Sequence, residues 1–464
     1  MKAQKEQSMR MLQGPLLPAI ISYTIPIILT SILQLLFNAA DLVIVGRWCG
    51  SVAVAAVGAT GAITNLIVNL FIGLSVGSGV TMAHALGGRD QEAAHRTVHT
   101  TLPVALISGA VLTVAGVALA EPLLRLMGNP EDVLPLSAKY MRIYFCGITF
   151  TMIYNFCASI LRAAGDTRSP LIFLTLAGVI NVVMNILFIT QLGMDVDGVA
   201  LATVISQGVA AALVVIAMIR RKDDSHLDLR KMRIYKYELL KIVRIGLPAG
   251  FQSSMFSISN VLIQSSVNSF GSVVMSGNAA AGNIEGFVWA AMNAFHQTAV
   301  NFTGQNMGAR RYDRIRMILW CCLGSVTVVG LALGGLAYGF GPRLLAVYIT
   351  DSPEAISYGM LRMAYMCIPY CLCGMMDVSS GSLRGLGSSF TPMLISVLGI
   401  CGIRIVWIYT IFQIPRFHSI DVLFASYPIS WAITYVAQLA AFLTIFNKFR
   451  KEHGIVPEPY DPSK

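Results

Sequence analysis

The sequence predicts an all-α polytopic membrane protein with twelve transmembrane helices in two pseudo-symmetric six-helix bundles. Hydrophobic residues make up 55% of the 464 residues and charged residues only 12%, against about 25% charged in ordinary soluble domains. Apolar runs long enough to cross a hydrocarbon core of roughly 30 Å recur along the whole chain. Landmarks of the first half also return in the second half. Composition therefore excludes a soluble multidomain protein.

The apolar runs are separated by charged loops or by loops rich in Gly and Pro, and they define the expected helices. The first six lie near 15–46, 52–86, 97–120, 134–158, 169–190 and 197–219. The second six lie near 239–269, 273–307, 315–339, 356–381, 391–412 and 421–446. We expect an N-terminal tail, an N-lobe, a basic linker, a C-lobe and a C-terminal tail, with the bounds 1–14, 15–219, 220–238, 239–446 and 447–464.

The net charge of +10 comes from cations that gather on one side of the membrane. Lys and Arg concentrate in both tails, in the linker and in the loops that share their side, whereas the opposite loops are richer in Asp and Glu. This bias places both termini in the cytoplasm. It also excludes nucleic acid as a partner and assigns the linker cations to topology and lipid headgroup contact. The basic N-terminus continues into the first helix, so we interpret it as a retained segment and not a signal peptide.

Five pairs of landmarks recur at an offset of 221 or 222 residues, which indicates an internal repeat. The pairs are Pro26 with Pro248, GSV at 50–52 with GSV at 271–273, LGGR at 86–89 with MGAR at 307–310, Tyr144 and Cys146 with Tyr365 and Cys367, and LRAAGDTRSP at 161–170 with LRGLGSSFTP at 383–392. An even number of helices per half gives both halves the same orientation. Parallel repeats of this kind are a transporter design, with the substrate path between the bundles.

The first helix carries one carboxylate within a long apolar run. Asp41 is the only charged residue between Leu16 and Val45, and it shares a helical face with Gln34 and Asn38. A charged group at this depth faces a wet cavity or a partner and is a functional candidate. The alternative is a structural carboxylate capped by a neighbouring hydroxyl or amide. Pro26 removes a backbone hydrogen bond, so we expect the helix to bend there.

Several short motifs together resemble the multidrug and toxic compound extrusion (MATE) family of bacterial type. They are NAAD at 38–41, the Gly-x-Arg turn after the second helix, LRAAGDT at 161–167, Asn181 with Asn185, and Ala202 with Thr203. The resemblance covers about 15–446 and implies two six-helix lobes in a V-shaped architecture. It also implies secondary active exchange of organic, often cationic, compounds for Na⁺ or H⁺, without a cofactor or enzymatic activity. We expect a monomer in the bacterial inner membrane.

Asp41, Asn181, Asn185 and Thr203 are similar in place to the N-lobe cation site of that family. Asn181 and Asn185 are four residues apart and share a helical face. A carboxylate, two amides and a hydroxyl supply the hard oxygen ligands that suit Na⁺, the one metal ion we expect here. The same cluster can instead hold a proton on Asp41, and simple interhelical amide bonding is the third reading. Some family members carry Asp at the Asn185 position, so the coupling ion is left open.

Polar residues of the second half extend the candidate substrate cavity. The seventh helix carries a polar stripe that includes Asn260 and Gln264, and such a face lines a cavity or an interface between lobes. Glu285 is followed on its helical face by aromatic and thioether side chains, a receptor for a lipophilic cation or simply packing. Asp377 resembles a tenth-helix aspartate of one family branch and serves as a proton site, a substrate site or a salt-bridge partner. The cavity candidates are Gln34, Asn38, Asn260, Gln264, Glu285, Trp289, Met292 and Asp377.

Arg404 lies inside the eleventh helix, too deep for a topology charge. The repeat offset places it within about two positions of Asn181. Our hypothesis is that the C-lobe carries a built-in guanidinium, paired with Glu285 or Asp377, where the N-lobe binds a free cation.

These observations favour a secondary active multidrug efflux transporter that exports organic compounds, cationic ones in particular, in exchange for H⁺ or Na⁺ by alternating access. A lipid-linked precursor flippase of the same superfamily is the first alternative, although the acidic cavity candidates favour cationic cargo. An integral membrane enzyme is the second, and the sequence contains no HExxH motif that would support it.

Overall fold

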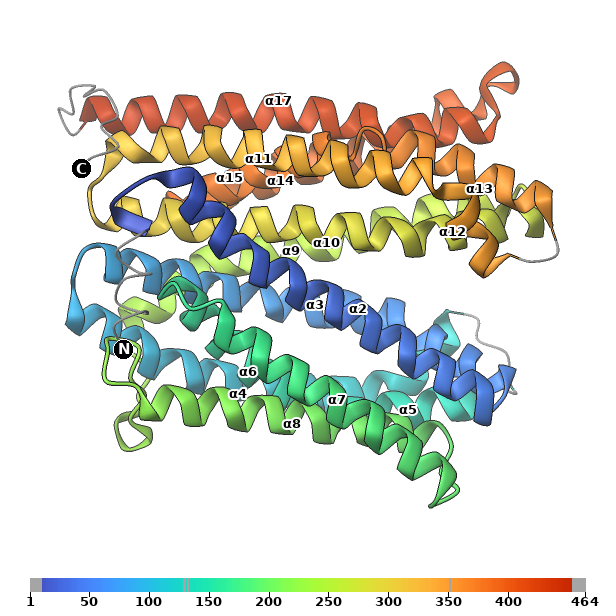
Figure 1. Cartoon of the computed structure of the whole chain (residues 1–464), viewed down its shortest axis with the longest axis horizontal. Coiled ribbons are helices and arrows are strands. Elements are labelled where there is room, and N and C mark those ends of the chain that lie inside the picture. The colour runs from blue at the N-terminus through green and yellow to red at the C-terminus, as the bar shows by residue number, and fades with distance from the viewer. Residues whose placement is uncertain (1–10, 128–130, 132, 350–351, 453–464) are drawn as a thin grey trace. The chain divides into compact units, whose positions relative to one another are not determined.

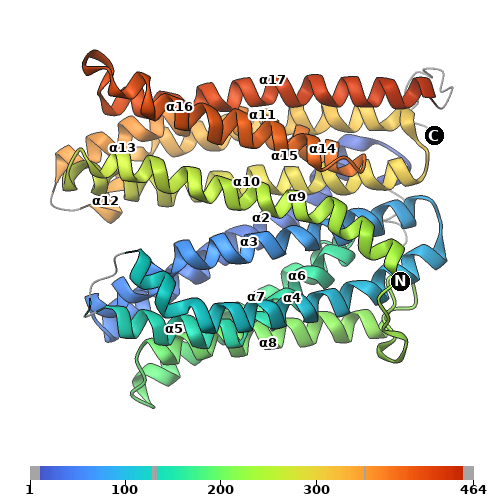
Figure 2. The ribbon, with the colours of Figure 1, turned by 180° about the vertical axis from the view of Figure 1, so that it is seen from behind.

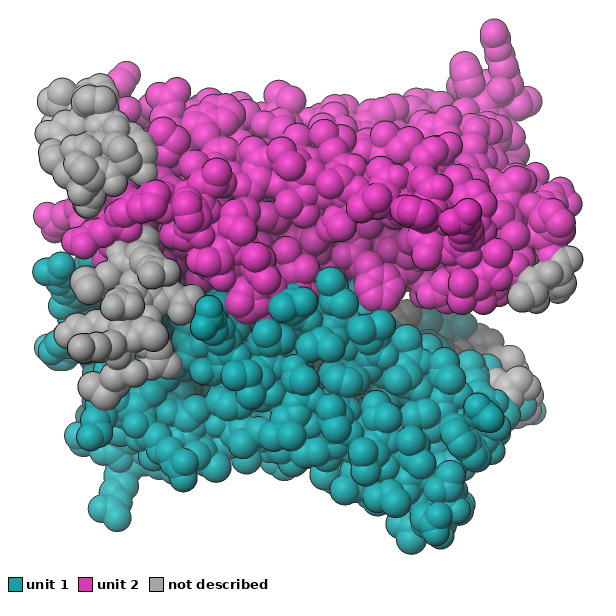
Figure 3. All heavy atoms as spheres, in the orientation of Figure 1, with its two compact units in different colours: residues 1–8, 29–254 teal, residues 9–28, 255–464 magenta. Residues whose placement is uncertain are grey.

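The protein is described by a computed structural model that covers residues 11–127, 131, 133–349 and 352–452, and its regular elements there are helical (Figure 1). These residues form two compact units, which Figure 3 shows in different colours. Unit 1 contains residues 29–254 and unit 2 contains residues 11–28 and 255–452 of the described chain. The predicted all-α class is confirmed.

Unit 1 is built from long antiparallel helices and includes the second half of α2 and the first half of α9. Its elements are α2 (Leu16–Trp48), α3 (Ser51–Gly87), α4 (Gln91–Leu126), α5 (Leu134–Cys146), α6 (Ile148–Ala163), α7 (Arg168–Thr190), α8 (Val196–Arg220), the 3₁₀ turn η1 (Leu229–Lys231) and α9 (Lys236–Asn268). Helix α4 packs against α3, α5 and α6, and α7 packs against α8. Their buried aliphatic and aromatic side chains form the core of the unit.

The fourth predicted helix is two helices in the structure. Helices α5 and α6 meet at a bend of 47° around Gly147. A Cβ added to Gly147 would lie 2.4 Å from a methyl carbon of Val204, so only glycine lets the bend approach α8 this closely. The apolar pattern continues through the bend, and hydropathy alone therefore predicts one helix.

Unit 2 contains parts of α2 and α9 and the whole of the later elements. These are α10 (Ser272–Gly308), α11 (Tyr312–Gly339), α12 (Gly341–Tyr348), α13 (Pro353–Met366), α14 (Tyr370–Gly385), α15 (Phe390–Ser396), the π turn η2 (Val397–Gly402), α16 (Ile403–Tyr409), η3 (Ile411–Gln413), η4 (Pro415–Phe417) and α17 (Ile420–Glu452). Helix α10 lies at the centre of the unit and packs against α11, α13 and α14. The tenth predicted helix is thus broken ahead of Tyr370, where Pro369 has no N–H to donate. The eleventh is interrupted by the π turn.

Helices α2 and α9 each contribute to both units, and here the units differ from the predicted lobes. The first half of α2 belongs to unit 2, where the rings of Tyr23 and Phe302 lie 5.3 Å apart. The hydroxyls of Thr24 and Thr298 are 2.8 Å apart in the same region. The first half of α9, which Figure 2 shows from behind, belongs to unit 1 and packs on α3 through glycines. Packing divides the chain inside these helices and not at the linker.

The internal repeat extends to matching backbone conformations. Gly50 and Gly271 have φ angles of 89° and 96°, and Gly165 and Gly387 both have φ of 90°. Arg89 and Arg310, the last residues of the two Gly-x-Arg turns, have φ of 54° and 56°, a left-handed conformation that is rare outside glycine. All three pairs fall at the repeat offset. The two halves therefore share the same helix-ending turns.

Eight helices of the described chain are long and apolar enough to cross a membrane, and the bent pair α5 and α6 is a ninth. Helices α9 and α10 and the pair α13 and α14 carry more polar residues but have membrane-spanning length as well. The twelve predicted spans are all present as helical segments. Residues 1–10 and 453–464 of the predicted tails lie outside the described residues, and α17 extends to Glu452 through the start of the predicted C-terminal tail.

Candidate functional site

The structure brings together Asp41, Asn181, Asn185 and Thr203 in unit 1. Asn185 Nδ2 donates to Asp41 Oδ1 at 2.6 Å and lies 3.3 Å from Asn181 Oδ1. Asn181 Nδ2 donates to Thr203 Oγ1 at 3.4 Å, and that hydroxyl donates to the carbonyl of Val199 at 3.0 Å. The four predicted residues of the N-terminal cation site therefore form one hydrogen-bonded chain across α2, α7 and α8.

A close approach of α2 and α7 positions this cluster. A Cβ on Gly178 would lie 1.9 Å from Cε2 of Phe37, so the Phe37 ring occupies the space that a side chain at Gly178 would need. Asp41 is one turn after Phe37, and Asn185 is two turns after Gly178. Beyond the close approach the two side chains meet in the hydrogen bond of 2.6 Å. Asn181 and Asn185 face inward because α7 presents its buried side there.

The cluster holds more acceptor capacity than donors. Asn185 is fully buried, and its Oδ1 has no hydrogen-bond partner. Within the described chain no ion pair joins a cation to the half-buried carboxylate of Asp41. Buried polar oxygens without a donor are costly. A proton on Asp41 or a small hard cation bound by the oxygens would remove this deficit, and the arrangement suits either one.

The remaining polar candidates on α2 are not part of the cluster. Gln34 and Asn38 are exposed on the second half of α2. Pro26 lies inside α2, in the half that belongs to unit 2. The bend expected at Pro26 stays a prediction.

A second buried polar group lies in unit 2 and is centred on Arg362, a residue that the sequence analysis missed. Arg362 Nε and Nη2 donate to the two carboxylate oxygens of Glu285, each at 2.8 Å, and Nη1 donates to Asn278 Oδ1. Asn278 in turn donates to Gln264 on α9 at 2.9 Å. Glu285 is 5% exposed and is neutralised by this fork. Arg362 is a cationic residue inside the apolar segment 356–381, and this position in the sequence could have identified it as a functional candidate.

Among the residues that the structure describes, Arg404 forms no ion pair with an acid, which corrects the expected pairing with Glu285 or Asp377. Its Nε donates to Ser430 Oγ at 3.2 Å, and its guanidinium carbon lies 4.1 Å from the ring centroid of Tyr427. Both oxygens of Glu285 are taken by Arg362. The π turn just before Arg404 adds one residue, which rotates the following side chains by about 100° relative to a regular helix.

Trp289, Met292 and Asp377 do not form a single receptor with Glu285. Trp289 is 46% exposed, whereas Met292 is fully buried against Gly374 of α14. The carbonyl of Asp377 accepts from Nδ1 of His296 at 2.7 Å, and the residue is half-buried. Its carboxylate forms no ion pair with any of the residues that the structure describes. Asn260 is exposed on α9.

Comparisons with known proteins agree with the repeat and with the fold. A family model described as MatE matches residues 26–187 and 248–410, one segment in each repeat. The chain is 26% identical to the "Probable multidrug resistance protein YoeA" of Bacillus subtilis over 434 residues, which cover 92% of this chain and 93% of that protein. It is 24% identical to the "FAD transporter" of Shewanella oneidensis, covering 84% and 86%.

Solved structures show the same fold. The structure titled "Crystal structure of MATE in the bent conformation" superposes with a TM-score of 0.86 over 97% of this chain and 99% of that one, at 20% sequence identity. At this identity the likeness concerns the fold alone. The fold, the repeat and the polar cluster at Asp41 are thus consistent with one another.

Proposed function

The chain belongs to the multidrug and toxic compound extrusion (MATE) family, and we propose that it exchanges small organic molecules for H⁺ or Na⁺ bound at Asp41. As a family member it is a membrane transporter and not an enzyme, and the names of its relatives support multidrug efflux. We place it as a monomer in the bacterial inner membrane with both termini in the cytoplasm, as the charge bias of its loops favours.

The unsatisfied oxygen beside Asp41 carries the proposal of ion coupling. Asn185 Oδ1 is buried without a donor, and its Nδ2 already donates to the Asp41 carboxylate. If the amide of Asn185 turned over, its oxygen would face the carboxylate, and a cation between the two would be coordinated by both. Thr203 and Asn181 would supply further oxygens. Protonation of Asp41 would instead remove the negative charge and give the carboxyl an O–H, which could donate to Asn185 Oδ1 once the amide has turned.

The location of Asp41 suggests how a bound ion would affect transport. Asp41 lies in the half of α2 that belongs to unit 1, and the other half of the same helix belongs to unit 2. An ion bound between Asp41 and α7 would stabilise the transporter conformation in which α2 lies against α7 more than it stabilises the other conformation. The shift between outward-facing and inward-facing states cannot exceed that difference in ion affinity.

Two carboxylates support a cationic cargo. Asp41 and Asp377 form no ion pair with a cationic side chain of the described residues, so a cationic compound would find negative charge at either one. Glu285 no longer counts as an independent receptor because Arg362 neutralises it. The proposal of a cationic cargo therefore rests on fewer acidic residues than the sequence suggested.

One observation favours a second candidate, a cargo that carries an anionic group. Arg404 is buried and has no carboxylate partner among the described residues, and one relative is named "FAD transporter", after a compound with phosphate groups. A lipid-linked precursor, the cargo of the flippase alternative, has the same chemistry. Arg404 would then provide the positive charge that such a group needs.

Flux measurements in proteoliposomes test the proposal. Efflux of a lipophilic fluorescent cation is recorded with an imposed pH gradient or an imposed Na⁺ gradient, for the wild type, Asp41→Asn and Asp90→Asn. Asp90 is a matched control because its side chain caps α4 by accepting from Ala93 N. We expect flux driven by one gradient, lost in Asp41→Asn and kept in Asp90→Asn. Full gradient-driven flux in Asp41→Asn would contradict ion binding at Asp41. Gradient-driven flux of FAD but not of the cation would favour the anionic cargo.

A further inference from the structure

The segment between α8 and α9 is held along α4, and we call residues 227–236 the strap. Its first residue, Leu227, is 1% exposed and packs with the core of unit 1. The amide of Leu227 donates to the carbonyl of Met218 near the end of α8, at 3.1 Å. At its other end the strap continues into α9, which begins at Lys236. The strap is therefore fixed at both ends within one unit.

His99 of α4 is the central anchor of the strap. Its ring is fully buried, with Nδ1 2.7 Å from the carbonyl oxygen of His95 and Nε2 3.1 Å from the amide of Asp228. A carbonyl only accepts and an amide N–H only donates, so Nδ1 carries the proton and Nε2 accepts. The ring is thus neutral and has both nitrogens occupied.

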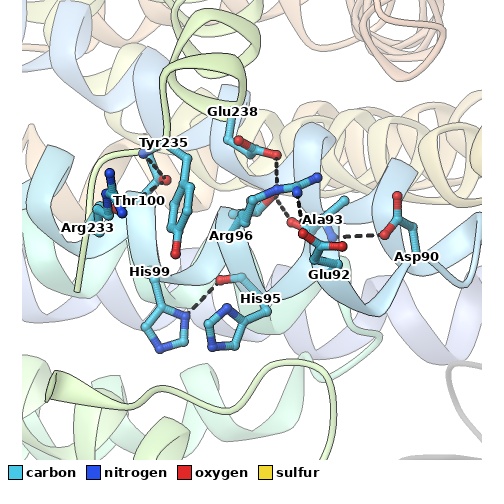
Figure 4. Close-up of polar contacts among 11 residues, drawn as sticks. Asp90, Glu92, Ala93, His95, Arg96, His99, Thr100, Arg233, Tyr235 and Glu238 are labelled. Atoms are coloured by element: carbon cyan, nitrogen blue, oxygen red, sulfur yellow. Dashed lines mark hydrogen bonds and ion pairs between the residues drawn. The ribbon is translucent and has the colours of Figure 1, made fainter. Parts of the chain in front are cut away.

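Further anchors follow His99 along α4, as Figure 4 shows. The amide of Arg233 donates to the carbonyl of His99 at 3.3 Å, and the amide of Tyr235 donates to Thr100 Oγ1 at 3.1 Å. Arg96 Nε donates to Glu238 Oε1 at 2.8 Å just beyond the strap. The backbone groups of the strap that face α4 are therefore bonded to it.

These anchors leave an outward face that is both apolar and basic. Leu229, Met232 and Ile234 are 47%, 38% and 40% exposed, although the short loop that carries them begins with the buried Leu227. Exposed cations alternate with them: Arg230, Lys231, Arg233 and Lys236. A row of exposed aliphatic side chains on a loop requires a partner surface.

The charge of this face indicates which partner it fits. Asp228 is the only acid among the ten residues of the strap. The N–H of Arg230 donates to Asp228 Oδ1 and lowers the pKa of that carboxyl below its ordinary value, so it stays ionised and pairs with Lys231 at 3.7 Å. The other three cations, Arg230, Arg233 and Lys236, give the strap a net positive charge beside its exposed apolar side chains. This combination is typical of segments that lie at the interface of an anionic leaflet.

We propose that the strap is a docking surface for the anionic phospholipid leaflet, with Leu229, Met232 and Ile234 inserted at the level of the headgroups and the cations bound to phosphates. Its position suits this role because the strap connects α8, a membrane-length helix that ends at Arg220, to the start of α9. The anchors on α4 hold the face in one orientation, so the lipid meets a preformed surface and no ordering of the loop is needed.

The test measures lipid retention on the full-length protein without any gradient or transported compound. The protein is placed in mixed micelles with equal amounts of phosphatidylglycerol and phosphatidylcholine, and retained lipids are counted by native mass spectrometry. The strap variant is Arg230→Gln, Lys231→Gln and Arg233→Gln. The matched control removes three cations from the end of α17: Lys448→Gln, Arg450→Gln and Lys451→Gln. A melting curve of each variant verifies that it is folded.

We expect the wild type and the α17 control to prefer phosphatidylglycerol, and the strap variant to lose at least tenfold of that preference, since each cation near an anionic surface contributes a factor of about 5. Leu229→Ser with Ile234→Ser should weaken retention of both lipids, and inorganic phosphate should not compete. Equal retention by the strap variant and the wild type would overturn the proposal, as would competition by inorganic phosphate. The outcome is independent of ion coupling, so a failed flux experiment leaves it intact.

Discussion

Asn185 determines which hydrogen-bonding group faces the carboxylate of Asp41. In the structure its amide donates to Asp41 and leaves its own oxygen without a partner. A carboxylate at this position has no N–H to donate, so two negative groups would face each other and require a cation between them.

Asn185→Asp should therefore raise the affinity for Na⁺. We expect at least a tenfold lower Na⁺ concentration for half-maximal thermal stabilisation, because a second carboxylate adds a charged ligand. Asn260→Asp, at an exposed amide of α9, serves as the control and should leave the Na⁺ dependence unchanged. An Asn185→Asp variant with the Na⁺ response of the wild type would mean that no cation binds between Asp41 and α7.

At this scale the sequence predicted residue types better than partners. The resemblance to the MATE family implied that Asp41 lies beside Asn181 and Asn185, and the four-residue spacing of the two asparagines agreed with it. The partner of Glu285 was not predictable in the same way, since Arg362 lies 77 residues away. Tertiary packing determines which distant cation lies beside a given carboxylate. Here α13, which carries Arg362, packs against α10, whereas α16, which carries Arg404, does not reach Glu285.

At the scale of elements, the Glu285–Arg362 pair joins α10 to α13. Glu285→Gln removes one charge and leaves the guanidinium of Arg362 buried without its counter-charge, which costs about 3–5 kcal/mol. We expect a clearly lower melting temperature in detergent for Glu285→Gln. The double variant Glu285→Leu with Arg362→Met should recover most of the loss, because it removes both charges. A Glu285→Gln protein as stable as the wild type would show that the pair does not stabilise the unit.

The strap and α4 are joined through the ring of His99. Its Nε2 accepts from the amide of Asp228 at 3.1 Å, and its Nδ1 donates to the carbonyl of His95 at 2.7 Å. The ring therefore fixes the start of the strap to α4.

We expect the amides of Asp228 and Arg233 to lose protection from hydrogen exchange in His99→Gln, because the glutamine side chain cannot satisfy both contacts with the geometry of an imidazole ring. His418→Gln, in unit 2, is the control and should behave as the wild type does. Wild-type protection of these amides in His99→Gln would contradict the role of His99 as an anchor.

Helix breaks were the least predictable elements. The sequence gives apolar segments of the right length for the fourth, tenth and eleventh spans, and these segments are present. The bend at Gly147 depends on the side chain of Val204 in α8, and the π turn before Arg404 on the fit of Gly399 against Thr434, whose hydroxyl would lie 2.2 Å from an added Cβ. Contacts between residues this far apart in the chain cannot be inferred from the local pattern of apolar and polar residues.

At the scale of the whole molecule, four glycines allow α3 and α9 to pack backbone to backbone within unit 1. A Cβ on Gly73 would lie 2.2 Å from the amide nitrogen of Gly250, and one on Gly77 would lie 2.1 Å from the carbonyl oxygen of Ile242. The four-residue spacing of Gly73 and Gly77 is typical of helices whose backbones pack closely, and the structure identifies α9 as their partner.

Gly77→Ala should destabilise the protein by about 3 kcal/mol or more, since its new methyl group would meet backbone that cannot rotate away. Gly61→Ala in the same helix is the control, because nothing lies within 4 Å of its added Cβ. There the exchange should be neutral or slightly stabilising, since Ala favours a helix by up to ~1 kcal/mol over Gly. Equal melting temperatures for the two variants would contradict the packing of α3 against α9.

The division of α2 between the units has a consequence for synthesis. Residues 11–28 are synthesised before residues 29–254 of unit 1, yet the core that buries Met11, Leu16 and Tyr23 is formed by residues after 255. The nascent chain must keep the start of α2 unpacked in the bilayer until these later helices have been inserted. Unit 2 can therefore finish folding only after all the helices of unit 1 have been made, using a segment that preceded them.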